Sequence, residues 1–320
     1  MRYRSLGKSG LTLSEIGFGA WGIGGATPGP TSYGYTDDIT SLAALECGLD
    51  LGINFFDTSN VYGNGNSEHL IGRAFSHRRC EVVIATKAGF VDYASPPDFS
   101  ASAIRRSVDS SLQRLNTDYI DLLQLHNPSA GWLQEHPETL EALVHMKKNG
   151  KVRAMGISVK SPVEAFSLLD LFPFDSVQAN FNMLDIRVLE CGLMEKLDEI
   201  GVGLIARTPL SFGFLSGLLS GEQEFLAEDH RSRWPREQIR LWASGAQNLQ
   251  ACCVESMDVP PYQVALRFCL SYSQVSTTIV GMLTPEEVAA NVLASDAGPL
   301  SPGSCAKIAA LHKTHKFIVS

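Results

Sequence analysis

The sequence predicts an α/β fold in which eight parallel strands close into a (β/α)8 TIM barrel, with an N-terminal β-hairpin and long loops at the C-terminal face. Eight short apolar segments alternate with helical patterns along the 320 residues, and this alternation is typical of a parallel sheet. The rival is an open doubly wound sheet, but Gly22-Ile23-Gly24-Gly25 lacks the GxGxxG spacing of its nucleotide-binding fingerprint. No linker is evident, so we expect a single domain over residues 1–320.

Local patterns mark each element of the N-terminal half. A polar hairpin at 3–12 precedes the first apolar strand. In the first helix, apolar residues recur at helical spacing until Gly52 ends it. A later helix carries Ile104, Val108 and Leu112 on one stripe. The expected strands are 15–19, 53–57, 82–85 and 120–125, and the expected helices are about 37–51, 67–75 and one around 104–115.

The C-terminal half repeats the alternation. Pro137 begins a helix whose last turn carries Lys147 and Lys148 before Gly150, the usual order of proline, cations and glycine along a helix. The stretch 207–245 shows no regular pattern, and in a barrel a long loop after a strand lies over the active-site mouth. The further strands are 152–157, 176–179, 202–206 and 277–280, and the further helices are near 161–170, 187–200, 247–273, 285–294 and, in the tail, 304–316.

Composition limits the functional classes. The net charge is -8 and no basic stretch stands out, so we expect neither a nucleic acid nor an anionic membrane surface as a partner. The first residues are polar and no apolar run is long enough to span a bilayer, so neither a signal peptide nor a membrane helix is expected. The 7 cysteines lack metal-ligand spacing, which favours reduced thiols, a cytoplasmic location and no metal site. The sequence does not indicate an oligomeric state.

Polar residues end six of the predicted strands. In a barrel, the functional groups come from the carboxyl ends of the strands. Each polar residue alone is most often the start of a solvated loop, but the barrel brings all six to one rim, where we predict the active site. The six residues are Asp57, Lys87, His126, Ser158, Gln178 and Arg207.

Tyr62 lies a short loop after Asp57 and completes a set suited to carbonyl reduction. The unperturbed pKa of a tyrosine is about 10. A neighbouring ammonium, that of Lys87, favours the phenolate and is expected to lower the pKa of Tyr62, which makes a proton donor for neutral pH. His126 can donate a hydrogen bond to a substrate oxygen. Acyl transfer is not expected, because no serine or cysteine nucleophile with an adjacent base is evident.

Several long motifs occur in order along the chain. They are the segments 6–11 (LGKSGL), 17–21 (GFGAW), 52–59 (GINFFDTS), 62–63 (YG), 67–68 (SE), 111–115 (SLQRL), 118–121 (DYID), 125–128 (LHNP) and 150–158 (GKVRAMGIS). Through these motifs the chain resembles the aldo-keto reductase family over nearly its full length. The motifs are long and ordered, so the resemblance is highly specific.

The resemblance implies a catalytic tetrad of Asp57, Tyr62, Lys87 and His126. Tyr62 is then the general acid of reduction, and Asp57 holds Lys87, which lowers the pKa of that acid. His126 orients the carbonyl group. A nicotinamide cofactor supplies hydride directly, without a covalent intermediate. In related reductases of steroid double bonds the histidine is replaced by glutamate, so His126 favours carbonyl chemistry.

Two positions depart from the nicotinamide site that the resemblance implies. Family members hold the carboxamide with a serine, an asparagine and a glutamine; Ser158 and Gln178 match, but Val159 stands at the asparagine position. Arg207 stands where many members stack a tyrosine on the ring. A stacked guanidinium would disfavour the oxidised ring and so favour reduction. The alternative is an ion pair between Arg207 and a carboxylate of the long loop.

The resemblance also implies the rest of the cofactor site. The segment 211–217 is similar to the family's pyrophosphate loop, and 278–287 with Asn291 is similar to its adenosine-phosphate segment. NADPH-preferring members place a cation at Leu283 or Glu287; neither is basic here, although a capping box with Thr284 also explains Glu287. The expected cofactor is therefore NADP, with NAD as the alternative. The expected cofactor-binding residues are Gly19, Trp21, Asp57, Ser158, Gln178, Arg207, Thr208, Leu210, Phe212, Gly213, Gly281, Leu283, Glu287 and Asn291.

Aromatic residues of the rim loops are expected to line a pocket for a medium-sized aldehyde or ketone. Arg231 and Arg233 either meet an anionic substrate or lie at the surface. Two other functions stay open, namely a redox-silent nicotinamide-binding regulatory subunit and a non-redox barrel lyase or isomerase. The expected substrate-binding residues are Trp21, Tyr62, Phe90, Tyr93, His126, Trp132, Phe181 and Trp234.

Overall fold

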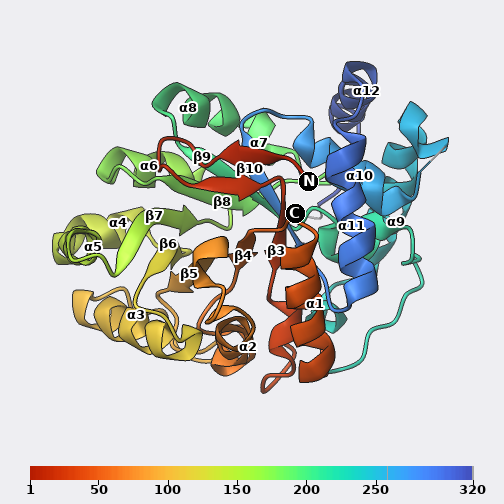
Figure 1. Cartoon of the computed structure of the whole chain (residues 1–320). Helices are drawn as coiled ribbons and strands as arrows, with labels where there is room; N and C mark the ends of the chain where they lie inside the picture. The colour runs from red at the N-terminus through yellow and green to blue at the C-terminus, as the bar shows by residue number, and fades with distance from the viewer. Residues whose placement is uncertain (258, 319–320) are drawn as a thin grey trace.

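The computed structural model describes residues 1–257 and 259–318. Its centre is a closed barrel of parallel strands (Figure 1), which confirms the predicted (β/α)8 fold. The strands are β3 (Ile16–Gly19), β4 (Phe55–Asp57), β5 (Val83–Ala88), β6 (Ile120–His126), β7 (Val152–Ser158), β8 (Ser176–Asn180), β9 (Gly203–Arg207) and β10 (Val275–Gly281). They follow one another in chain order around the barrel, and β10 closes it by pairing with both β3 and β9.

Helices surround the barrel, and apolar side chains from them join the buried core around the strands (Figure 1). In α3, Ile104, Val108 and Leu115 form a buried stripe, Ser100 caps the first turn by accepting from Ala103 N, and Asn116 ends the helix. The helices are α1 (Asp38–Asp50), α2 (Asn66–Phe75), α3 (Ala101–Leu115), α4 (Ala130–Glu135), α5 (Pro137–Lys148), α6 (Glu164–Leu171), α7 (Arg187–Glu190), α8 (Leu193–Ile200), α9 (Arg236–Ala251), α10 (Pro261–Leu270), α11 (Pro285–Ala297) and α12 (Pro302–His312).

The predicted N-terminal hairpin closes the amino-terminal end of the barrel. It consists of β1 (Tyr3–Ser5) and β2 (Thr12–Ser14). Leu6 and Leu13 are fully buried and pack with Phe55, Leu122 and Ile205 in the barrel interior. Since apolar side chains fill this end, the functional cavity lies at the opposite end, where the strands have their carboxyl ends.

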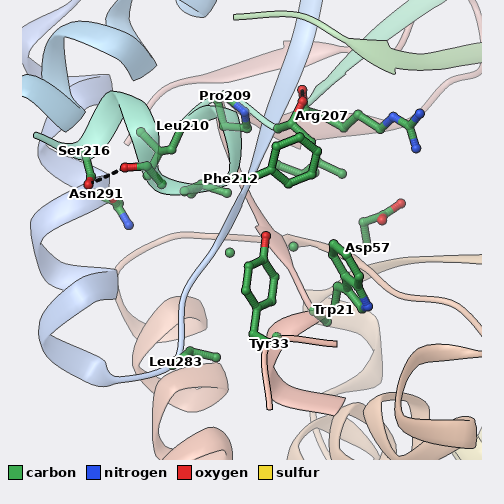
Figure 2. A pocket seen from close by; sticks show the side chains of 18 of the residues that line it. Trp21, Tyr33, Asp57, Arg207, Pro209, Leu210, Phe212, Ser216, Leu283 and Asn291 are labelled. Carbon is green, nitrogen blue, oxygen red and sulfur yellow. Dashed lines mark hydrogen bonds between the residues drawn. The ribbon is translucent and has the colours of Figure 1, made fainter. Parts of the chain in front are cut away.

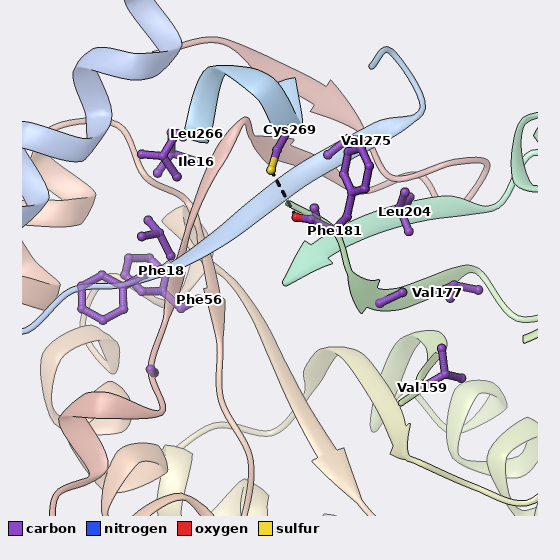
Figure 3. Packing of buried hydrophobic residues seen from close by; sticks show 14 of the residues in the cluster. Ile16, Phe18, Phe56, Val159, Val177, Phe181, Leu204, Leu266, Cys269 and Val275 are labelled. Carbon is purple, nitrogen blue, oxygen red and sulfur yellow. Dashed lines mark hydrogen bonds between the residues drawn. The ribbon is translucent and has the colours of Figure 1, made fainter. Parts of the chain in front are cut away.

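A second apolar layer lies between the barrel and the helices. The rings of Phe18 and Phe56 stack with centroids 5.8 Å apart, and Phe56 contacts Phe75 of α2 at 4.5 Å. Figure 3 shows Cys269 of α10 pointing at Phe181 just beyond β8, where its thiol donates to the Phe181 carbonyl at 3.3 Å. This packing holds the strand ends rigidly at the rim.

Three predicted elements differ from the structure. The helix expected at 187–200 is divided into α7 and α8 by Gly192, whose φ is 75°. The helix expected at 247–273 is wrong, because Pro260 and Pro261 prevent a continuous helix and separate α9 from α10. The stretch 207–245 is not irregular throughout, because α9 begins at Arg236. The tail does form a helix, α12.

Within residues 1–257 and 259–318, no helix combines the length and apolar character needed to cross a membrane. In the same part of the chain, no group of three His, Cys, Asp or Glu side chains is arranged to hold a metal ion. All seven cysteines are free thiols.

Candidate active site

A cavity of about 760 Å³ opens at the carboxyl ends of the strands. This volume is in the range of pockets that bind cofactors and other small molecules. Six strands contribute lining residues at or near their carboxyl ends, and these residues are Gly19, Asp57, His126, Gln178, Arg207 and Gly281. The strand ends therefore meet at one rim, as the alternation of strands and helices predicted.

A buried ion pair forms the floor of the reacting end. Lys87 Nζ donates to Asp57 Oδ1 at 2.5 Å and to Thr58 O at 2.8 Å. Asp57 Oδ2 accepts from Gln124 Nε2 at 2.9 Å and from Gln178 Nε2 at 2.7 Å. Burial lowers the pKa of Lys87, while the charge of Asp57 opposes this effect. Four hydrogen bonds thus hold the carboxylate and the ammonium in fixed positions.

Tyr62 lies directly beside this pair. The Lys87 ammonium is 5.0 Å from the centre of the phenol ring. The ring is held in place by a tight turn in which Gly63 has a φ of 59°. A side chain at Gly63 would clash with the carbonyl of Gly24, so only glycine fits this close approach of two loops. Local backbone geometry therefore directs the phenol into the cavity, which Tyr62 lines.

The phenol of Tyr62 stays protonated in this environment. Burial raises the pKa of Tyr62, and the charge of Asp57 raises it further. The positive charge of Arg207 lowers the pKa by a smaller amount, so the net shift is upward. The expected fall in the pKa of Tyr62 is therefore wrong for this arrangement, because burial and the charge of Asp57 together outweigh the nearby positive charge. A protonated phenol is the state that a proton donor needs.

His126 ends β6 on the other side of the cavity. Its Nδ1 is buried without a hydrogen-bond partner among the residues described, and the ring of Phe90 meets it edge-on at 5.1 Å. Burial and the positive charges of Lys87, Arg207 and Lys160 lower the pKa of His126 well below 6.5. The imidazole is therefore neutral and keeps one nitrogen as a hydrogen-bond donor.

This lowered pKa predicts the acid side of the pH profile. A group whose pKa is depressed keeps its neutral form until the pH falls below the depressed value. We therefore expect kcat/KM for reduction to stay constant as the pH falls from about 8 to about 6, because His126 does not become protonated near pH 6.5. NMR titration of the imidazole would check the assignment. A His126 resonance that titrates at 6.5 together with activity would contradict it.

Arg207 reaches across β8 to the end of β7. Its Nη2 donates to Val159 O at 2.9 Å, and its Nε is buried without a partner. The guanidinium makes no ion pair with a carboxylate of the described residues, so the expected pairing with the long loop is wrong. Val159 itself is fully buried. The charge of Arg207 is thus left free inside the cavity.

The rest of the cavity forms a groove suited to a dinucleotide. Figure 2 shows Arg207 and Asp57 at one end and Ser216 and Asn291 at the other. Between them, the turn after β9 has φ values of 44° at Ser211, 57° at Phe212 and 102° at Gly213. Successive left-handed residues form concave sites that bind anions such as phosphate. The groove therefore fits a long ligand with a charged middle.

The start of α11 lines the far end of this groove with Leu283, Glu287 and Asn291. Glu287 N donates to Thr284 Oγ1 at 3.3 Å, and Glu287 Oε2 accepts from Leu283 N at 2.7 Å. Thr284 thus caps α11 as predicted, but the carboxylate of Glu287 bonds to the residue before the cap rather than to Thr284 N, as a full capping box would have it. The bond to Leu283 N fixes the carboxylate of Glu287 beside the groove.

The structure brings most of the predicted site residues together, but not all of them. Lys87, Ser158, Phe90, Trp132, Phe181 and Trp234 do not line the cavity. Ser158 donates to Gln178 Oε1 at 3.2 Å behind the lining. Trp132 stacks on His136 at 4.0 Å. Phe181 is fully buried against Phe268, and Trp234 packs edge-on against Trp242 at 4.8 Å. Phe181 and Trp234 are therefore not placed to contact a substrate in the cavity.

Several lining residues were not predicted. Asn180 follows Gln178 by two positions, so the alternation of a strand already places the two side chains on one face. Tyr33 has no such signal. It lies in a loop that pairs with the long loop after β9 through a bridge between Ser32 and Asp229.

Known proteins with similar sequences and structures are members of one family. The chain matches the family model "Aldo/keto reductase family" over residues 15–313. L-galactose dehydrogenase of Arabidopsis thaliana is 31% identical over 299 residues, which cover 91% of this chain and 87% of that protein. A probable voltage-gated potassium channel subunit beta of the same plant is 30% identical over 317 residues, which cover 94% and 93%. The holo form of an aldo-keto reductase from Bacillus halodurans has a TM-score of 0.79 at 30% identity, and the match covers 100% of this chain and 98% of that one.

The barrel, the matched residues and the full-length relatives agree with one another. The family match spans the strands and helices that carry the cavity, from β3 to the C-terminal helix. The relatives cover most of their own length as well as most of this chain. This chain belongs to the aldo-keto reductase family of oxidoreductases.

Proposed function

We propose that the chain is an NAD(P)H-dependent reductase of aldehydes or ketones in which Tyr62 is the general acid. The observation that carries the proposal is the convergence of four groups at one end of the cavity: the phenol of Tyr62, the ammonium of Lys87, the carboxylate of Asp57 and the imidazole of His126. A protonated phenol can give its proton to an oxygen that gains negative charge. In the reverse direction the same groups would oxidise an alcohol.

Each residue has its own part in this reaction. A nicotinamide cofactor supplies the hydride when it is bound. Tyr62 donates its phenol proton to the carbonyl oxygen, and the ammonium of Lys87 beside the ring stabilises the phenolate that is left. Asp57 holds that ammonium in place. His126, neutral, donates a hydrogen bond to the same oxygen and so orients the carbonyl.

The groove offers positions for each part of the cofactor. At the reacting end, Gln178 and Arg207 would lie beside the nicotinamide, with Ser158 supporting Gln178 from behind. The left-handed turn at Phe212 and Gly213 would hold the pyrophosphate. The remaining residues proposed for the cofactor are Gly19, Trp21, Asp57, Thr208, Leu210, Gly281, Leu283, Glu287 and Asn291.

Glu287 bears on the choice between NADP and NAD. The resemblance favours NADP, but a carboxylate beside the adenosine end repels a 2′-phosphate, which carries close to two negative charges. We expect Glu287→Gln to lower the KM for NADPH by about two- to fivefold and to leave the KM for NADH unchanged. The amide oxygen can still accept from Leu283 N, so KM values with both cofactors isolate the charge. Equal shifts for the two cofactors would contradict this role of Glu287.

A redox-silent regulatory role is the second candidate, because a potassium channel subunit beta is among the relatives. The deciding experiment measures the consumption of NADPH and of NADH across diverse carbonyl compounds and repeats it with Tyr62→Phe. Cofactor binding without any consumption would favour the regulatory role. Product formed without a cofactor would indicate a lyase or isomerase. A small carbonyl compound as substrate and a cytoplasmic location belong to the main proposal.

A further inference from the structure

Arg207 holds a positive charge at the reacting end of the cavity. Its guanidinium donates from Nη2 to Val159 O at 2.9 Å, and its Nε is buried without a partner. Arginine keeps its proton in proteins, and burial lowers the pKa of Arg207, which reflects the free-energy cost of a charge removed from water. The side chain is only partly exposed, and a charge largely removed from water is normally paired, so an anionic ligand would stabilise it.

The carboxylates near Arg207 are already engaged. Asp57 pairs with Lys87 at 2.5 Å. Asp185, whose charge also acts on Arg207, is held by Nε and Nη2 of Arg187 at 2.8 and 2.6 Å. The phenol and the imidazole of the site are both neutral at physiological pH. The described residues at this end of the cavity therefore carry one uncompensated positive charge.

The side chains around Arg207 also have free hydrogen-bonding atoms. Asn180 lies opposite Arg207 in the register of β8 and β9, and its Oδ1 is buried without a partner. His126 Nδ1 is likewise buried and unpartnered. Lys160 also acts on His126, but its side chain is exposed and screened by water, so it does not add to the charge inside the cavity. The amide oxygen of Asn180 only accepts hydrogen bonds, so an anionic ligand would be held by the guanidinium of Arg207 rather than by this atom.

We propose that the carbonyl substrate of this chain carries a carboxylate that Arg207 binds, so that oxo acids and aldehyde acids are preferred over neutral carbonyl compounds. The inference rests on the proposed function. A carboxylate accepts hydrogen bonds from an arginine fork, and the guanidinium of Arg207, which lines the cavity, donates to the described residues only from Nη2 and so has donors left for a ligand. One carboxylate also balances one positive charge, whereas a phosphate would leave excess negative charge in a buried site.

The cofactor does not supply this anion. Figure 2 shows the side chain of Arg207 extending away from Ser216 and Asn291, toward the side where the carboxylate of Asp57 lies. The left-handed turn that fits phosphate oxygens lies on the other side. A reduced nicotinamide is neutral and an oxidised one is positive, so neither balances Arg207. The charge balance is left to the substrate.

Arg231, which the sequence offered for an anionic substrate, is not available for this role. Its guanidinium forms a bidentate pair with Asp229, with distances of 3.0 and 2.7 Å to the two oxygens. It also donates to Phe212 O at 3.1 Å. Arg233 is exposed and does not line the cavity. Arg207 is therefore the arginine of the lining that has no carboxylate partner among the described residues.

The test compares an acid with its uncharged ester, since esterification removes the charge and keeps the carbonyl. The ratio of kcat/KM for 4-carboxybenzaldehyde to that for methyl 4-formylbenzoate is measured, and likewise for succinic semialdehyde and its methyl ester. We expect Arg207→Met to lower this ratio roughly 10- to 100-fold, and Arg207→Lys to keep part of it. Arg240→Met, which removes an exposed cation paired with Glu222 outside the cavity, leaves the ratio unchanged.

A second variant tests the charge balance without touching Arg207. Asn180→Asp places a carboxylate opposite the guanidinium and is nearly isosteric with asparagine. We expect it to lower the acid-to-ester ratio as Arg207→Met does, because the protein then supplies the missing anion. An unchanged ratio in both variants overturns the proposal. In that case, equal slowing of acid and ester shows that Arg207 acts on the cofactor or on Tyr62 instead.

Binding separates this inference from the proposed function. Benzoate and benzamide are titrated by calorimetry into wild type and Arg207→Met, with NADPH or NADH present. We expect wild type to bind benzoate more tightly than benzamide and Arg207→Met to lose that preference. If no carbonyl compound is reduced, the proposed function fails, while the benzoate preference still decides the inference. Equal affinity of wild type for benzoate and benzamide overturns it.

Discussion

Tyr62→Phe lowers kcat/KM for carbonyl reduction by about 10²- to 10⁴-fold, because the proton donor is removed while the ring stays. The ring keeps its contacts with Trp21, at 6.1 Å between centroids, and with the ammonium of Lys87, at 5.0 Å. The fold and the shape of the cavity are therefore expected to survive. The measurement is steady-state reduction of an aldehyde panel with saturating NADPH or NADH.

A matched control distinguishes lost chemistry from lost packing. Tyr272 is a partly buried tyrosine outside the cavity, with its ring edge-on to Phe181 and Phe268. Tyr272→Phe removes the same hydroxyl from a distant place and is expected to keep wild-type kcat/KM. Thermal unfolding and cofactor binding of Tyr62→Phe should stay close to wild type. If Tyr62→Phe keeps a third or more of the activity, another group donates the proton.

Lys87→Met destabilises the protein by about 3–5 kcal/mol, because it leaves the carboxylate of Asp57 buried without its cation. Asp57 is 2% exposed and Lys87 is 1% exposed, so water cannot replace the lost partner. Gln124 and Gln178 still donate to the carboxylate, but neutral donors do not balance its charge. The free energy of unfolding in urea is the measurement. Activity falls as well, because the phenolate of Tyr62 loses its neighbouring ammonium.

The double variant Asp57→Asn/Lys87→Met tests this explanation. Removing both charges leaves no unpaired ion in the barrel, so the double variant should be more stable than Lys87→Met alone. The two single changes are then strongly non-additive, as expected for residues in direct contact. Additive losses of stability would show that Lys87 stabilises the barrel through the packing of its aliphatic chain rather than through its charge.

The fold was readable from local patterns because each strand and helix carries its own signal. Apolar runs of strand length alternate with helical stripes, and eight repeats of this unit close on themselves. The same rule located much of the site: parallel strands end on one side, so Asp57, His126, Gln178 and Arg207 had to share a rim. The errors at 187–200 and 247–273 also had local causes, at Gly192 and Pro260.

Contacts between residues far apart in the sequence decided which aromatic residues line the cavity and which charges of the site are paired. Trp132 and Trp234 are aromatic residues like Trp21, but their rings pack on other aromatic rings and do not line the cavity. The sequence alone does not show which of several apolar positions an aromatic side chain will occupy. The charge state of the site depends in the same way on long-range contacts. Burial raises the pKa of Tyr62, and Arg207 is left unpaired because the nearby acids bind other cations. Periodicity along a chain encodes which face a residue occupies, whereas pairing and desolvation depend on residues far apart in the sequence.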